Sequence, residues 1–125
     1  MRSGTVMRAD GRRWASRCWR ASTFWSRMRG LLGRKGLGPG EALLIDRCGS
    51  VHTVGMRFAL DLVFVDRAWR VLRVVRGVPP GRWMVSGGWR AARVYESEAG
   101  RLDCGGLAVG ETLRWEADGN GPARG

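Results

Sequence analysis

The alternation of apolar and polar positions predicts a chain built mostly of short strands. Two alternating runs, "GTVMRAD" and "RWASRCWRA", flank Asp10-Gly11 and predict a β-hairpin over residues 4–21. Asp-Gly favours a tight turn because both of its positions tolerate a positive φ. Further apolar or alternating runs predict strands over residues 42–47, 50–56, 60–66, 70–78, 92–99 and 112–115.

Two segments carry a different pattern. In "STFWSRMRGLLGRKG" (22–36) apolar residues recur at i, i+1, i+4, i+7 and i+8, which predicts an amphipathic helix. The stretch "GRLDCGGLAVGE" (100–111) predicts a short helical turn followed by a loop. Between the strands, "PPGRWMVSGGWR" (79–90) predicts an irregular segment that exposes Trp83 and Trp89.

Together these elements predict a mainly-β fold, a compact β-sandwich or barrel with one short amphipathic helix and a second helical turn. Residues 1–116 are expected to form a single domain, and the polar residues 117–125 a disordered tail. No apolar run approaches the roughly 20 residues that span a bilayer. The arginine-rich N-terminus lacks the apolar stretch of a secretory signal, so we expect a cytoplasmic protein.

The charge is concentrated near the N-terminus. The chain has a formal net charge of +11, and residues 1–40 hold ten of its basic side chains and only one acid. Such a region can attract phosphate backbones, anionic lipid headgroups or an acidic protein surface. All but one of the 22 basic residues are arginine, as a coding bias would also produce. A true anion-binding face and a merely solvated surface both remain open.

Cysteine and histidine are too few for the usual metal or disulfide frameworks. Cys18, Cys48 and Cys104 are odd in number and widely spaced, and no C-x-x-C pair is present. His52 is the only histidine and cannot complete a usual zinc set without carboxylates. We therefore expect neither a bound metal nor a cofactor.

A polar constellation surrounds His52 in "GSVHTVGMRFALDLVFVD" (49–66). On a strand, period-two alternation places His52 on an apolar face, where a hydrogen-bonded core histidine is the expected state. Asp61 and Asp66 border turns and can accept backbone N–H groups there. Cys48 would lie roughly 13 Å from His52 along an extended strand, too far for a nucleophile and its base. We interpret His52, Asp61 and Asp66 as structural and assign no catalytic residue.

Three segments occur in order: "RMRGLLGRKGL" (27–37), "VHTVGMRFALDLVFVDRAWRVLRV" (51–74) and "ARVYESEAGRLDCGGLAVGETL" (92–113). Over residues 14–115 the chain thereby resembles the uncharacterised prokaryotic family called domain of unknown function 192. The shared motifs are R-x-x-G-L-L-x-R, L-D-x-x-F-x-D, and E-x-x-A-G followed by G-L-x-V-G-E. The resemblance implies a compact β-sandwich or barrel with short helices, and it implies no established activity.

The favoured function is a non-catalytic binding or accessory module with an arginine-rich face. Its partner would be a small ligand, a peptide or an acidic protein surface. The candidate ligand contacts, expected to converge on one concavity, are Arg27, Arg34, Arg57, Glu96 and Trp83. One alternative is nucleic-acid or other polyanion binding through the basic N-terminal third. A second is a hydrolase-like enzyme that uses His52 with Asp61 or Asp66.

Overall fold

The fold is mainly β. The computed structural model describes residues 2–21 and 36–119, and these ranges contain nine strands and no helix. The strands are β1 (Arg2–Arg8), β2 (Arg13–Ala21), β3 (Glu41–Asp46), β4 (Ser50–Val51), β5 (Leu60–Val65), β6 (Val71–Val78), β7 (Val85–Ser86), β8 (Arg93–Glu98) and β9 (Leu113–Ala117). The predicted amphipathic helix over 22–36 lies almost entirely outside the described residues, as do Arg27 and Arg34.

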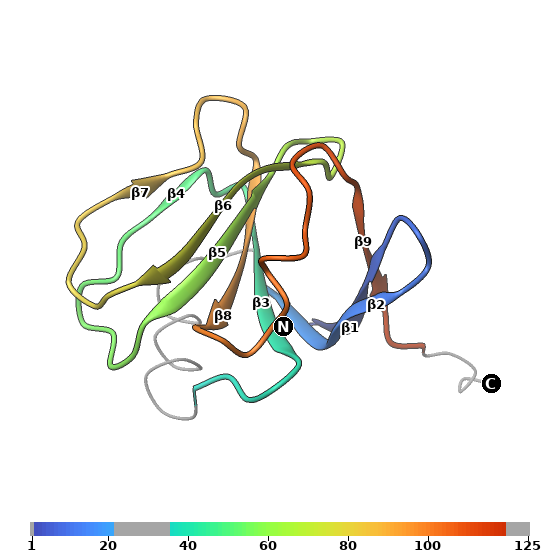
Figure 1. The fold of residues 1–125 in the computed structure, drawn as a ribbon, viewed down its shortest axis with the longest axis horizontal. Coiled ribbons are helices and arrows are strands. Elements are labelled where there is room, and N and C mark those ends of the chain that lie inside the picture. Colours follow the sequence, from blue (N-terminus) through green and yellow to red (C-terminus); the bar gives the residue numbers. More distant parts are fainter. Residues whose placement is uncertain (1, 22–35, 120–125) are drawn as a thin grey trace.

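Seven strands form one sheet in the order β6-β5-β8-β3-β2-β1-β9, and β4 pairs with β7 in a separate two-stranded sheet (Figure 1). Within the large sheet only β2 and β3 run parallel, and the other pairs are antiparallel. At one end of the sheet, the carboxyl ends of β2, β3 and β5 therefore lie beside the amino end of β8. Arg93, the first residue of β8, is in register with both Asp46 and Val65.

The predicted N-terminal hairpin is confirmed. β1 and β2 pair antiparallel around Asp10-Gly11, and Gly11 has a φ of 88°. The Asp10 carboxylate accepts a hydrogen bond of 2.9 Å from the backbone N–H of Arg12, which closes the turn.

The large sheet curls toward one of its faces. The apolar cluster on that face joins Val6 of β1, Val71 of β6 and Leu113 of β9 to Tyr95 in the sheet centre. A backbone bridge between Arg70 and Thr112 also brings the starts of the two edge strands together at one end. Along the rest of their length the edges do not pair, so the sheet stays open and the predicted sandwich or barrel is confirmed only as a mainly-β fold.

The second face carries its own apolar cluster. It gathers Leu43, Leu62, Phe64 and Val94 from the central strands, together with Val51 and Val85 of the small sheet. The β4–β7 pair thus covers part of this face (Figure 1). Alternate residues of β3, β5 and β8 belong to opposite clusters, as the period of two in a strand requires.

Two sequence-based elements are wrong. The strand predicted over 50–56 ends at Val51, because Thr53 is buried and starts a turn that Gly55 completes with a φ of 87°. The helical turn predicted within 100–111 is a series of turns and bends.

β9 continues through Ala117, and Asp118 donates its N–H to the Ser3 carbonyl, so ordered pairing extends past the expected domain boundary. No helix in the described ranges is long and apolar enough to cross a bilayer.

Candidate anion-binding cleft

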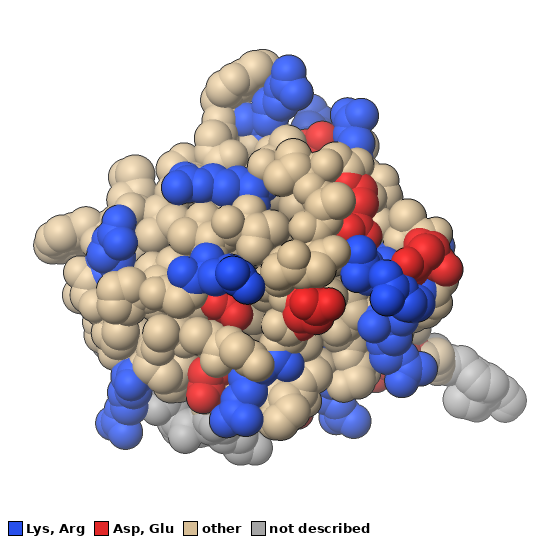
Figure 2. Space-filling model, viewed as in Figure 1, with Lys and Arg blue, Asp and Glu red and all other residues tan. Residues whose placement is uncertain are grey.

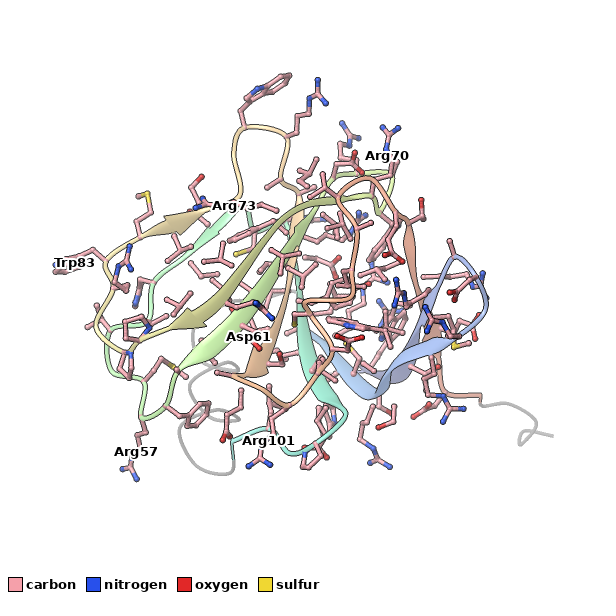
Figure 3. All side chains as sticks on the ribbon, viewed as in Figure 1. Arg57, Asp61, Arg70, Arg73, Trp83 and Arg101 are labelled. Carbon is pink, nitrogen blue, oxygen red and sulfur yellow. The ribbon has the colours of Figure 1, made fainter. Side chains whose placement is uncertain are left out.

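The structure does not bring Arg57, Trp83 and Glu96 to one concavity. Arg57 is exposed on the connection between β4 and β5, and Trp83, with 82% of its surface accessible, lies at a separate tip of the molecule (Figure 3). Glu96 is fully buried in the middle of β8. The predicted convergence therefore fails for these three residues, while Arg27 and Arg34 fall in the segment that is not described.

Asp61 and Asp66 bind backbone N–H groups. Asp61 accepts from Gly77 at 2.8 Å and from Gly100 at 3.0 Å, one bond to each carboxylate oxygen. Asp66 accepts from the N–H groups of Ala68 and Arg70, both at 2.9 Å, and closes the turn between β5 and β6. Asp66 therefore bonds its own turn, whereas the partners of Asp61 lie in β6 and beyond β8 and not in the connection that precedes it.

His52 lies just beyond β4, half-buried, where its Nδ1 accepts from the backbone N–H of Val54 at 3.3 Å. It does not share an alternating apolar face, because Val54 is 39% exposed in the turn that follows.

A cleft forms where the strand ends of the large sheet meet. It has a volume of about 820 Å³ and is lined by Arg20, Asp46, Arg47, Cys48, Gly49, Arg67, Ala91, Ala92 and Arg93. The sheet topology explains the set, because Arg20 is near the end of β2, Asp46 ends β3 and Arg93 begins β8. Backbone bonds from Cys48 to Ala92 and from Ala92 to Val65 hold the flanking loops against this edge.

A charged network forms one wall of the cleft. Arg20 donates to both oxygens of Asp46, from Nε at 2.7 Å and from Nη2 at 3.0 Å, and Arg93 Nε donates to the same carboxylate at 3.1 Å. Burial opposes ionisation of Asp46, but the hydrogen bonds and charges of the two arginines lower its pKa below the usual range. The carboxylate is thus held ionised between two guanidinium groups.

Aromatic rings support the same arginines. The Arg93 guanidinium lies 3.8 Å from the ring centre of Trp69, and Arg20 lies between Trp69 and Trp115, at 5.2 and 5.0 Å. Stacking on a ring face fixes the plane of a guanidinium, and both of these groups also donate N–H bonds to Asp46. The nearby Tyr95 hydroxyl is buried, and no described residue hydrogen-bonds to it.

Two further arginines of the cleft have no acidic partner among the described residues. Arg47 and Arg67 are exposed, and among the described residues neither guanidinium group makes an ion pair or a hydrogen bond. The contact of Arg67 with the network is through its carbonyl oxygen, which accepts from Arg93 Nη1 at 3.3 Å. The segments outside the described ranges contain no aspartate or glutamate that could pair with them. Four arginines against Asp46 alone give the lining a formal charge of +3.

Backbone geometry around the cleft is unusual. Within the described ranges only Arg47 and Trp69 have a positive φ without being glycine, at 53° and 69°. This region is costly for residues with a Cβ, and such strain gathers at functional sites. Gly49 is required for close packing, since a Cβ there would lie 2.8 Å from the Ala91 carbonyl oxygen. The strained and tightly packed positions thus coincide with the arginine cluster.

Comparison with known proteins places this geometry in a family. The profile of DUF192, described as "Uncharacterized ACR", matches residues 5–115. The chain belongs to this family. A UPF0127 protein from Thermococcus sibiricus is 26% identical over 120 residues, covering 90% of this chain and 75% of the relative.

Two solved structures share the DUF192 fold. A protein of unknown function from Novosphingobium aromaticivorans superimposes with a TM-score of 0.73 and 23% identity, over 90% of this chain and 84% of that one. A Sinorhizobium meliloti protein, described only provisionally as a transcription regulator, gives 0.71 and 21% identity over 91% and 92%. At these identities the likeness shows the fold alone.

Sequence reasoning missed the cleft residues of this DUF192 chain. The four arginines lie on β2, on two loops and on β8, and only the strand order brings them together. One local signal was available, the run Asp46-Arg47 directly after the buried strand "ALLI". Across the described part of the chain, no three His, Cys, Asp or Glu side chains gather closely enough to hold a metal ion.

Proposed function

We propose that this DUF192 domain is a binding module whose cleft takes a small anion with at least two phosphate or carboxylate groups. The observation that carries this function is a cleft in which Arg47 and Arg67 have no acidic partner among the described residues, while Arg20 and Arg93 are already fixed in place. Guanidinium groups bind such oxygens through paired N–H donors, and prior fixation lowers the entropic cost of binding.

The size of the cleft supports a ligand larger than a single phosphate. Its volume of about 820 Å³ lies within the usual range for small-molecule sites. Arg47 and Arg67 approach it from separate loops, so a ligand with two anionic groups could engage both. Asp46 would orient Arg20 and Arg93 without meeting the ligand itself, because its oxygens already accept three bonds.

The chemistry of the cleft favours binding over catalysis. Cys48 is its one potential nucleophile, and burial raises the pKa of this thiol to about 11. The thiol is therefore protonated and weakly reactive at neutral pH. The thiol also donates a hydrogen bond of 3.1 Å to the Ser50 carbonyl oxygen.

The compartment we propose is the cytoplasm. Cys18, Cys48 and Cys104 are unpaired and buried, as is common where thiols are kept reduced. Nucleic-acid binding through the basic N-terminal third stays a prediction, because residues 22–35 fall outside the described ranges.

Calorimetric titration with pyrophosphate and citrate tests the proposed function. We expect wild-type protein to bind one anion per chain, and the double variant Arg47→Gln/Arg67→Gln to bind at least tenfold more weakly, because charge-assisted hydrogen bonds contribute roughly 1.5–3 kcal/mol each. Arg57→Gln/Arg114→Gln removes two exposed arginines outside the cleft and is the matched control. Equal losses in both double variants, or no binding by wild type, would exclude a site in this cleft.

A further inference from the structure

A second surface lies at the opposite end of the β5–β6 hairpin from the cleft. The loop after β6 carries Trp83 and Met84 with 82% and 66% of their surfaces accessible, and Val54 is exposed in the turn between β4 and β5. Thr53, next to Val54, is hydrogen-bonded to this loop, so Val54 and the Trp83–Met84 segment are neighbours. Trp83 projects from the end of the molecule (Figure 3). We call Trp83, Met84 and Val54 the apolar tip.

The apolar tip is held in place. Thr53 is fully buried, and its hydroxyl donates to the Pro79 carbonyl at 2.7 Å and accepts from the N–H of Arg82 at 2.8 Å. Its own N–H donates to the Arg82 carbonyl at 2.8 Å, and its carbonyl accepts from the N–H of Gly81 at 2.9 Å. The buried Thr53 hydroxyl thus uses both its donor and its acceptor capacity to hold a loop whose tryptophan faces solvent. The exposure of Trp83 is therefore a property of the fold.

The charge around the tip is mainly basic. Residues 50–60 and 73–86, which contain the tip and the small sheet, hold four arginines and no aspartate or glutamate. The adjoining Asp61 has each carboxylate oxygen hydrogen-bonded to a backbone N–H. Arg57 projects at the end of the molecule on which Trp83 lies, and the basic side chains in view come nearer to that end than the acidic ones do (Figures 2 and 3). Arg82 directly precedes Trp83 in the loop.

We propose that the apolar tip docks this protein on a membrane surface rich in anionic lipid. Tryptophan partitions to the boundary between headgroups and acyl chains, Met84 and Val54 add apolar area, and the surrounding arginines meet lipid phosphates. A convex tip with projecting apolar side chains suits insertion into a soft interface. Single-stranded nucleic acid instead needs a basic groove with successive stacking platforms, and Trp83 is the one aromatic ring at this tip.

Vesicle sedimentation tests the docking surface. We expect wild-type protein to bind vesicles in which about a third of the lipid is anionic phosphatidylglycerol and the rest is phosphatidylcholine. Its binding to pure phosphatidylcholine vesicles should be far weaker. Trp83→Ala should weaken binding about tenfold, since a large apolar side chain leaves the interface. Arg82→Gln should weaken it by about fivefold, as one fewer cation meets the anionic surface.

Trp89→Ala is the control for Trp83→Ala. Trp89 is 90% exposed but lies on the loop before β8, against Arg90 and close to Asp66, so its loss should leave vesicle binding unchanged. Arg47→Gln/Arg67→Gln should also leave it unchanged, which separates this surface from the anion-binding cleft. Absence of binding to anionic vesicles, or equal effects of the two tryptophan variants, would overturn the docking surface. Retention on a single-stranded oligonucleotide through Trp83, without vesicle binding, would overturn it as well.

Discussion

Glu96 places an ionisable carboxyl in the middle of β8, in register with Leu43 of β3 and Leu62 of β5. Both of its oxygens are buried and have no hydrogen-bond partner among the described residues, and this burial raises its pKa from 4.5 to about 8. The folded state therefore binds the proton more tightly than the unfolded chain does. The resulting stability is fully present below pH 4.5 and is lost as the pH rises through about 8.

Glu96→Gln tests this buried carboxyl. Between pH 5 and 8 the wild-type free energy of unfolding should fall by up to about 1.4 kcal/mol per pH unit, and the variant should lose most of that slope. Glu98→Gln, at the half-exposed end of the same strand, should keep the wild-type slope. Urea unfolding at several pH values measures all three proteins. Parallel pH profiles for wild type and Glu96→Gln would show that the carboxyl is not protonated in the folded state.

Asp61 links two elements through its separate oxygens, one to Gly77 in β6 and one to Gly100 beyond β8. Asp61→Asn offers only one acceptor and sets an amide N–H₂ against a backbone N–H, so we expect a loss of about 1–3 kcal/mol in the free energy of unfolding. Asp103→Asn is the control, because one oxygen of this exposed side chain accepts the Gly106 N–H and an amide oxygen can replace it. Thermal melts that shift equally for both variants would contradict the linking role.

At the scale of elements, the small sheet depends on close packing against the large one. Gly87, directly after β7, donates its N–H to the Gly49 carbonyl, and a Cβ at this position would overlap the ring of Phe64. Gly87→Ala should therefore cost about 1–3 kcal/mol, since the buried ring cannot move away freely. In Gly38→Ala the nearest atom is the movable Glu41 Oε1 at 3.4 Å, so its denaturant midpoint should change little. Equal stabilities of the two variants would show that β7 can shift.

The strands that the sequence predicted well are those whose local pattern agrees with their burial. β5 and β8 are continuous apolar or alternating runs bounded by turn residues, and both were placed within one residue. The pattern failed over 52–56, where "HTVGM" alternates like a strand but Thr53 turns inward to bond the 79–82 loop. Contacts 29 residues apart cannot be seen in a local period.

At the scale of the whole molecule, the candidate site follows from strand order more than from any motif. Arg20 and Arg93 become neighbours of Asp46 only because β2 runs parallel to β3 and β8 antiparallel to it. Charge composition pointed to an anionic partner, but it drew attention to the N-terminal third and to Arg57, which is exposed away from the cleft. The anionic ligand that we propose thus agrees with the charge composition, but the cleft lies away from the segment to which that composition pointed.

The most direct measurement of the cleft is a pyrophosphate titration of ¹⁵N-labelled protein followed by NMR, including the arginine Nε–Hε signals. Saturable shifts should gather at Arg47, Arg67 and Arg93 and in the backbone of residues 46–49 and 91–93. Arg57 and Arg114, which are exposed outside the cleft, should move only in proportion to ionic strength. Equal shifts at all surface arginines, or none in the cleft at millimolar pyrophosphate, would contradict an anion-binding site there.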